Sequence, residues 1–484
     1  MIKKILIANR GEIALRVMKT CKRLGIKTVA IYSEADTTSL HVSEADEAVY
    51  IGGYTPRESY LVMEKVLKAA VDTGADAIHP GYGFLSENAE FARQVAEAGM
   101  IFIGPSPEAI HTLGDKTAAR ELAIQQNVPI APGSPGAIED FVEVQRFAGE
   151  IGYPVLLKAA AGGGGKGMRV VEEESELEAA FKGAQGEALA AFNDSRVFIE
   201  KFIKNPRHIE IQILGDTHGN VLYFPERECS IQRRLQKVIE ESPSVAVTPE
   251  IRKNMGEAAA RLITAANYTN AGTIEFLLDA SGSFYFMEVN TRLQVEHPVT
   301  EMVSGVDLVE QQILIASGEA LKIKSDDIKP NGHAIECRIC AEDVFNGFLP
   351  DTGIVDFLKL PEADYIRNDS ALKVGYEVTV HYDPMVGKLI VWGENRDVAI
   401  ERVLKALDNY HLSGFKTTIP FCRIVIDTEE FRTGNISTQY VKNHWKEEIP
   451  QEWHGLLASV AAFARNSNDS RRKPEMPEIH LWNV

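Results

Sequence analysis

Hydrophobic positions in the first part of the chain repeat with two periods, that of a buried strand and that of an amphipathic helix. An apolar run over residues 3–8 predicts a strand of a parallel sheet, and residues 12–24 repeat their apolar positions with a helical period. Gly25 ends this helix, and a second apolar run at residues 28–32 completes a strand–helix–strand unit. Because similar alternation continues, residues 1–114 are predicted to form a doubly wound, Rossmann-like α/β domain.

A second unit is predicted over residues 115–330, and it contains a glycine-rich loop. Strand-like runs at residues 153–158 and 168–171 flank the loop 159–167, which holds four consecutive glycines. Such a loop is costly to order, so we expect it to be mobile when empty and to close over phosphates through its backbone N–H groups. The predicted lid spans about residues 131–203. A flexible hairpin tip without a binding role is the alternative for the loop taken alone.

The pattern changes again near residue 331. Residues 332–340 alternate as a strand on which Glu336 and Arg338 share a face, and a helical period follows at residues 396–407. This combination predicts an α+β domain over residues 331–446. The remainder, residues 447–484, is predicted to be a short irregular tail.

The most unusual alternation lies between residues 284 and 297. Its odd positions are almost all apolar, whereas the even positions from 288 onward are acidic, amide, basic, amide and acidic in that order. A strand over this whole run would pack one face and carry chemistry on the other. The even positions are Phe284, Phe286, Glu288, Asn290, Arg292, Gln294 and Glu296.

The preceding strand-like run, residues 272–279, is joined to this one by a turn signal at residues 280–283. The turn can be a two-residue loop or a four-residue loop. Both lengths give the same strand register, in which Glu275 faces Glu288. Two carboxylates about 5 Å apart repel by about 3 kcal/mol at an effective dielectric constant near 20, so they would shift a pKa or hold a cation between them. With Asn290 alongside, the oxygen ligands suit Mg²⁺. Alternating charges on a solvated sheet face would give the same pattern.

The charge balance limits the kind of partner. The chain has 484 residues and a formal net charge of −18, which argues against general nucleic-acid binding. An anionic substrate must therefore meet a local group of cations. Candidates are Lys116 and Lys158 beside the glycine-rich loop, and the basic run of Arg233, Arg234 and Lys237, for which a solvated face is the alternative.

Cysteine usage and hydropathy indicate the compartment. The five cysteines are scattered, and neither a signal peptide nor a long apolar span is evident. These features predict a reduced, cytoplasmic protein without a membrane segment. Cys337 and Cys340 have CxxC spacing, but they lie in a strand and no second pair accompanies them, so a metal site there is not expected.

Five motifs together resemble one family, the biotin carboxylase component of the biotin-dependent carboxylases, which are ATP-grasp enzymes. The motifs are residues 7–14, 79–88, 162–167, 226–237 and 288–298. The resemblance implies a pre-ATP-grasp N-terminal domain, an ATP-grasp domain and a C-terminal biotin carboxylase domain. It also implies a reaction in which MgATP and bicarbonate give ADP and carboxyphosphate, whose CO₂ passes to N1 of biotin.

The resemblance assigns roles residue by residue. Glu275, Glu288 and Asn290 would bind Mg²⁺ or Mn²⁺. ATP would be held by Lys116, Lys158, Gly164, Gly165, Glu200, Lys201, Phe202, Ile203, His208, Gln232 and Leu277. Bicarbonate would be held by Lys237, Arg292, Gln294 and the backbone of Val295. Glu296 would be the base that deprotonates it, Arg338 would stabilise the biotin enolate, and Tyr82 would line the biotin site.

The resemblance also implies partners. The single Met–Lys pair, Met18–Lys19, lies in the first predicted helix, so biotin is expected on a separate biotin carboxyl carrier protein, with a carboxyltransferase subunit as second partner. The family suggests a homodimer. Position 235 is Leu where many relatives have His near the ribose, which predicts altered nucleotide contacts and intact catalysis.

The tail after residue 446 resembles the start of the linker in acyl-CoA carboxylases, which favours an acetyl-CoA or propionyl-CoA system. The alternatives are the biotin carboxylase subunit of a two-subunit pyruvate carboxylase, another bicarbonate-using ATP-grasp ligase, and a nucleotide-sensing module without turnover.

Overall fold

The computed structural model describes residues 2–160, 168–192, 194–449 and 451. Gly164 and Gly165, two of the residues expected to hold ATP phosphates, lie outside the described residues, as does the tail from residue 452 onward. Among the described helices, none combines the length and the apolar content that crossing a membrane would require.

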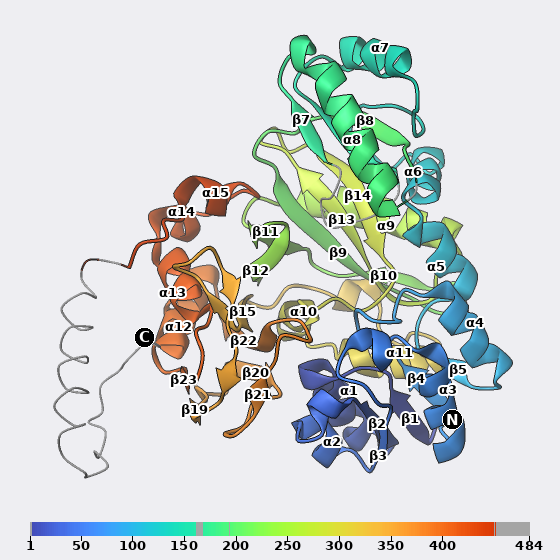
Figure 1. Cartoon of the computed structure of the whole chain (residues 1–484), viewed down its shortest axis with the longest axis vertical. Helices are drawn as coiled ribbons and strands as arrows, with labels where there is room; N and C mark the ends of the chain where they lie inside the picture. The colour runs from blue at the N-terminus through green and yellow to red at the C-terminus, as the bar shows by residue number, and fades with distance from the viewer. Residues whose placement is uncertain (1, 161–167, 193, 450, 452–484) are drawn as a thin grey trace.

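The N-terminal segment forms a five-stranded parallel sheet in the order β3-β2-β1-β4-β5, drawn in blue at the bottom of Figure 1. Its strands are β1 (Lys4–Ile7), β2 (Lys27–Tyr32), β3 (Glu47–Tyr50), β4 (Ala77–His79) and β5 (Ile101–Phe102), and its helices are α1 (Gly11–Arg23), α2 (Leu40–Glu44), α3 (Met63–Thr73), α4 (Ala89–Glu97) and α5 (Pro107–Gly114). The predicted doubly wound fold is confirmed. The strand order reverses between β1 and β4, the place where open α/β sheets expose functional groups.

A nine-stranded sheet forms the centre of the molecule. Eight strands follow the order β14-β13-β9-β11-β12-β15-β22-β20, and β10 pairs with β9. They are β9 (Arg207–Gly215), β10 (Val221–Tyr223), β11 (Arg227–Arg233), β12 (Gln236–Ser242), β13 (Asn270–Leu278), β14 (Phe284–Asn290), β15 (His333–Cys340), β20 (Ile366–Ser370) and β22 (Met385–Gly393). Because β12 pairs with β15, the strands of the C-terminal segment continue the sheet of the preceding segment.

A smaller antiparallel sheet stands at the top of Figure 1. It consists of β7 (Arg169–Val171), β6 (Val155–Ala159) and β8 (Val197–Lys201), packed with α7 (Phe141–Ile151) and α8 (Leu177–Phe192). Its own core includes Val155, Leu157 and Ile199, all fully buried. The remaining elements are α6 (Lys116–Gln125), α9 (Pro249–Ala265), α10 (His297–Ser304), α11 (Leu308–Ala316), α12 (Arg396–Asp408), α13 (Ile419–Asp427), α14 (Glu429–Arg432), α15 (Tyr440–His444), β16 (Glu342–Asp343), β17 (Leu349–Pro350), β18 (Gly353–Ile354), β19 (Phe357–Lys359), β21 (Glu377–Val378) and β23 (His411–Ser413).

The predicted continuous strand from Phe284 to His297 is wrong in its second half. The strand ends at Asn290, a loop follows, and His297 begins α10. Pro298 explains the change, because proline fits the first turn of a helix and cannot donate within a central strand. The polar alternation beyond Asn290 therefore belongs to a loop at the end of β14. The next helix, α11 (Leu308–Ala316), begins after Asp307, whose side chain caps it.

Candidate active site

One large cavity, with a volume of about 1070 Å³, opens between the N-terminal loops, the central sheet and the small sheet. Every described residue to which the resemblance gave a role lines it, whereas Arg234 of the basic run does not and donates to the carbonyl of Gly347 at 3.3 Å. The lining residues with an expected role are Tyr82, Lys116, Lys158, Glu200, Lys201, Phe202, Ile203, His208, Gln232, Lys237, Glu275, Leu277, Glu288, Asn290, Arg292, Gln294, Val295, Glu296 and Arg338. These residues are far apart in the sequence, and the strand order of the sheet brings them to one cavity.

The ammonium group of Lys237 lies among three buried carboxylates. Its Nζ donates to Glu210 Oε2 at 2.6 Å, to Glu275 Oε1 at 2.7 Å and to Glu296 Oε1 at 2.6 Å. Glu210, Glu275 and Lys237 come from β9, β13 and β12, so the sheet fixes their spacing. Burial alone would lower the pKa of Lys237, but the three carboxylates outweigh burial and raise it well above its usual value.

Glu296 is fully buried and lies between two cations. Besides Lys237, it accepts from Arg338 Nη2 at 2.9 Å. Burial would raise the pKa of Glu296, yet Lys237 and Arg338 hold it well below its usual range. The carboxylate is therefore ionised at neutral pH and able to accept a proton. Its Oε1, the oxygen that accepts from Lys237, also lies 3.9 Å from the thiol of Cys229.

The loop between β14 and α10 is held by side chains from other segments. Arg292 donates through Nε to Glu87 at 2.8 Å and through Nη1 to Gln294 Oε1 at 2.9 Å. Gln294 in turn donates to Glu275 at 3.2 Å, and the carbonyl of Val295 accepts from Lys388 at 2.7 Å. These contacts place a guanidinium, an amide and a backbone group beside Glu296.

The hairpin register predicted from the sequence is confirmed, since Glu275 lies opposite Glu288. Burial, followed by the charge of Glu275, raises the pKa of Glu288. Lys116 Nζ is 3.8 Å from Glu288 Oε2, and the Asn290 amide nitrogen is buried without a partner. Two opposed carboxylates and an amide oxygen suit a hard divalent cation such as Mg²⁺ or Mn²⁺, so the residues present fit the metal that the sequence predicted.

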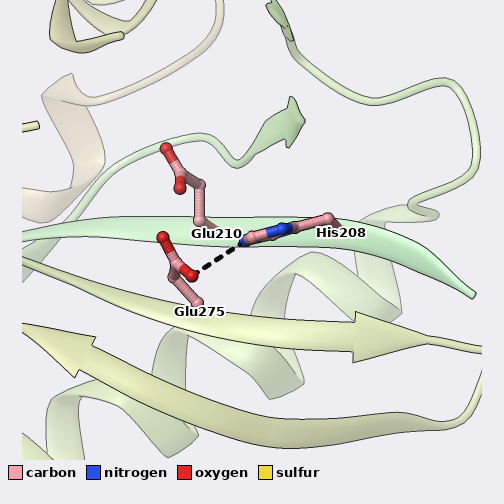
Figure 2. Close-up of side chains that lie close together, drawn as sticks. All are labelled: His208, Glu210 and Glu275. Atoms are coloured by element: carbon pink, nitrogen blue, oxygen red, sulfur yellow. Dashed lines mark ion pairs between the residues drawn. The ribbon is translucent and has the colours of Figure 1, made fainter. Parts of the chain in front are cut away.

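Another acidic group, drawn in Figure 2, is better explained by Lys237 than by a metal. His208, Glu210 and Glu275 offer ligand atoms within 4.8 Å of one another, and His208 Nε2 lies 3.0 Å from Glu275. Figure 2 shows Glu210 and Glu275 on neighbouring strands with their carboxylates projecting to the same side. The ammonium of Lys237 already contacts both carboxylates, so it occupies the position that a cation would need.

The comparisons with known proteins agree with this geometry. Family models match three successive segments: the biotin carboxylase N-terminal domain over residues 1–110, the ATP-binding domain of the carbamoyl-phosphate synthase L chain over 115–324, and the biotin carboxylase C-terminal domain over 336–443. A biotin carboxylase from Nostoc sp. is 52% identical over 439 residues, which cover 91% of this chain and 98% of the relative. The chain belongs to the biotin carboxylase family.

Solved structures support the same conclusion. A biotin carboxylase complex from Campylobacter jejuni, named as a beta-gamma-ATP complex, matches with a TM-score of 0.89 at 48% identity and covers 92% of this chain and 99% of its own. A biotin carboxylase domain dimer of the Hydrogenobacter thermophilus 2-oxoglutarate carboxylase, with MgADP, ADP and bicarbonate, matches with a TM-score of 0.88 at 49% identity, covering 92% of this chain and 98% of its own. The resemblance inferred from the five motifs is confirmed, and this biotin carboxylase is an ATP-dependent ligase with three-domain architecture.

The residues expected near the nucleotide differ in their contacts: some are already paired with other protein groups, and others face the cavity. The ammonium of Lys158 contacts Glu200 across the small sheet. Lys201 donates to the backbone carbonyls of Gly152 at 2.9 Å and Tyr153 at 3.0 Å, so its charge is committed there. Leu235 stands at the β11–β12 turn with a left-handed φ of 68° and a half-exposed side chain on the cavity.

Tyr82, which was expected to line the biotin site, is half-buried. Its hydroxyl donates to Glu12, and burial, followed by the charge of Glu12, raises the pKa of the phenol well above its usual value. The tyrosine still lines the cavity. The hydroxyl is held by Glu12 of the first helix.

Sequence reasoning missed several residues of this biotin carboxylase site. Glu210 was not singled out, although His208, Glu210 and Gln212 alternate along one face of a strand and a period of two could have found it. Glu240 and Lys388 come from other segments, and no pattern near either residue marks it as part of the site. Glu12 and Glu87 lie within two of the five motifs, and Glu336 shares a strand face with Arg338, yet none of the three was given a role.

Proposed function

We propose that this chain uses ATP and bicarbonate to carboxylate biotin that is carried by a separate carrier protein. The observation that carries the proposal is the buried, ionised Glu296 between Lys237 and Arg338, on the wall of a cavity large enough for a nucleotide and a second substrate. A base next to fixed cations is what the activation of bicarbonate requires.

Bicarbonate would lie against Arg292, Gln294 and the Val295 backbone. Glu296 would then take the bicarbonate proton, and the resulting carbonate oxygen would attack the γ-phosphorus of ATP with ADP as leaving group. The neighbouring guanidinium and ammonium groups favour this step, because they meet the added negative charge without rearrangement. Carboxyphosphate is the product of the step.

Glu275, Glu288 and Asn290 would hold Mg²⁺ or Mn²⁺. When bound, the metal neutralises charge on the transferred phosphate. Lys116, whose Nζ is 3.8 Å from Glu288, and Lys158 both line the cavity and would contact phosphate oxygens. The adenine and ribose would occupy the region lined by residues 200–203, His208, Gln232 and Leu277, and Leu235 would change the ribose contacts without affecting catalysis.

Carboxyphosphate would release CO₂ and phosphate, and the phosphate would remove the proton from N1 of biotin. Arg338 would stabilise the enolate that forms, with Tyr82 lining the biotin site. Biotin delivery on a biotin carboxyl carrier protein and transfer to a carboxyltransferase subunit are proposed on the family resemblance. A homodimer and a cytoplasmic location are proposed with it; all five cysteines are free thiols.

We further propose an acyl-CoA as the final acceptor. The propionyl-CoA carboxylase alpha chain of Mus musculus is 51% identical over 497 aligned positions that cover 99% of this chain and 69% of the relative, so the match includes the tail. A two-subunit pyruvate carboxylase is the second candidate, because a biotin carboxylase subunit of pyruvate carboxylase matches with a TM-score of 0.81 at 49% identity, covering 92% of this chain and 98% of its own.

The decisive experiment measures ADP release by the purified chain with and without bicarbonate and free biotin. Release that requires both substrates is expected. Bicarbonate-dependent hydrolysis that ignores biotin would contradict biotin as acceptor, and bound ATP with no turnover even with a biotinylated carrier present would overturn the proposal.

A further inference from the structure

A second pair of carboxyl groups lies behind Arg338, on the face of the central sheet that α10 covers. Glu240 on β12 and Glu336 on β15 are directly opposite each other in an antiparallel pair, and both are fully buried. Side chains in such positions have Cβ atoms about 5 Å apart, so the two carboxyl groups are within reach of each other. None of the roles assigned above involves either group.

The charges on this face do not balance if every carboxyl group is ionised. Arg338 is shared by Glu240 and Glu296, and Lys388 lies 3.1 Å from Glu12. Both oxygens of Glu336 are buried without a partner, as is Oε2 of Glu240. An isolated buried carboxylate costs several kcal/mol, so Glu336 must be neutral or share a proton. The free Glu240 oxygen opposite it is the acceptor that a carboxylic acid needs.

We propose that Glu240 and Glu336 share one proton, with Glu336 donating to Glu240 Oε2, and that the pair is a positioning element for Arg338. Glu240 Oε1 then holds Arg338 Nε at 2.5 Å, which leaves Nη2 on Glu296 and the rest of the guanidinium facing the cavity. Without Glu240, Arg338 would have Glu296 as its one carboxylate partner among the described residues, and the base would be more tightly engaged.

The electrostatics of the surrounding elements agree with this arrangement. Burial raises the pKa of Glu336 well above its usual value. Lys388 on β22 opposes this shift, and the charge of Glu240 adds to it. Burial raises the pKa of Glu240 to about 7. Arg338 and Lys237 oppose this shift, and the charge of Glu296 adds to it. On α10, His297 donates through Nδ1 to a carbonyl and stays neutral, since burial lowers its pKa well below the usual range. On the N-terminal side, Glu12 is matched by Lys388.

The pair therefore holds one proton above about pH 7 and two below it. Once Glu240 is protonated, Arg338 loses the carboxylate at Nε. This inference rests on the proposed function, because Arg338 is given a role there. It predicts that biotin-dependent turnover falls on the acid side with an apparent pKa of about 7.

Two isosteric variants test the pair, with a matched control. Glu240→Gln should lower biotin-dependent kcat by about tenfold, because Arg338 would no longer be directed at the substrate. The variant should also lose the acid limb, which is the fall of biotin-dependent turnover as the pH decreases through about 7. Glu241→Gln is the control: Glu241 is also buried on β12 with an arginine partner, Arg396 at 2.7 Å, but it lies on the opposite face. That variant should lose stability and keep the acid limb. An acid limb unchanged in Glu240→Gln would overturn the positioning role.

Infrared spectroscopy tests the shared proton without turnover. Wild-type protein at mildly alkaline pH should show the carbonyl stretch of a buried carboxylic acid, and this band should shift in ²H₂O. The band should be absent from the spectrum of the Glu336→Gln variant. If Glu336→Gln removes no such band, the shared proton is excluded. If the band is present while turnover never requires biotin, the carboxyl pair stands and the proposed function fails.

Discussion

Replacing Lys237 by Met removes the one cation that three buried carboxylates share. Each Nζ–oxygen distance is 2.6–2.7 Å, which corresponds to about 6 kcal/mol of gross attraction per pair at an effective dielectric constant near 20. Most of that attraction offsets the cost of burying the charges. Removing one partner of a buried ion pair typically costs about 3–5 kcal/mol of unfolding free energy.

A second route gives a similar magnitude. The variant can relieve the repulsion by binding a proton on one carboxyl, and protonating a glutamate of ordinary pKa 4.3 at pH 7 costs about 4 kcal/mol. We therefore expect Lys237→Met to lower the free energy of unfolding by about 4 kcal/mol at neutral pH.

The loss should depend on pH with a defined sign. In the native protein, Lys237 holds the pKa values of Glu275 and Glu296 below their usual range against the effect of burial, so these groups contribute stability above their unfolded pKa values and lose it as the pH falls. In the variant, burial is opposed only by the remaining partners, such as Arg338 beside Glu296 and His208 beside Glu275, so the folded pKa values rise. The difference between the two proteins should therefore be largest at neutral and alkaline pH and should shrink below about pH 4–5.

Urea unfolding of both proteins at a series of pH values, without divalent metal, measures this difference. Lys253→Met is the control, because Lys253 lies 3.8 Å from Glu257 on an exposed helix face and its removal should change little. A deficit below about 1 kcal/mol at neutral pH, or one that does not vary with pH, would refute the reasoning about the shared cation.

Three further substitutions test separate parts of the site. Glu296→Ala should lower bicarbonate-dependent ADP release by roughly 10²–10⁴-fold while MgATP affinity, measured by calorimetry, changes little; full turnover would exclude Glu296 as the base. Glu288→Gln should raise the Mg²⁺ concentration needed for nucleotide binding, and an unchanged Mg²⁺ titration would contradict the metal assignment. Arg227→Met should destabilise the fold by about 3–5 kcal/mol in denaturant unfolding, since Glu210 and three other polar groups lose a fully buried guanidinium; wild-type stability would contradict this expectation.

The sequence predicted those parts of the site that depend on local order. The pairing of Glu275 with Glu288 follows from two strand periods and one short turn, and a two-residue period fixes which side chains share a face. The strand to helix change at His297 was missed, because the polar alternation from Glu288 to Glu296 continues past the point where the strand ends. Pro298 was the available signal, and the alternation outweighed it.

The parts that could not be predicted depend on which strands become neighbours. The pairing of β12 with β15 places Glu240 opposite Glu336, although 96 positions separate them (336 − 240). Hydrophobic periodicity reports the faces of a strand and carries no information about its partners. For the same reason the sequence marked Lys237 as one member of a basic run and gave no indication that three glutamates surround it.

The strand order also arranges the proposed chemistry in sequence across the sheet. Glu288 lies on β14 and Glu275 on β13, followed by Glu210 on β9, Lys237 on β12 and Arg338 on β15. Neighbouring strands are about 4.8 Å apart, so the groups proposed for phosphate transfer, bicarbonate activation and biotin carboxylation follow one another at intervals set by backbone hydrogen bonds. Lys237 contacts Glu210 and Glu275, whose strands both lie on the β14 side of β12, and Glu296 at the start of α10. Because a sheet resists changes in strand spacing, the charges that meet the anionic intermediates are fixed before substrate arrives, and this preorganisation is what makes them effective.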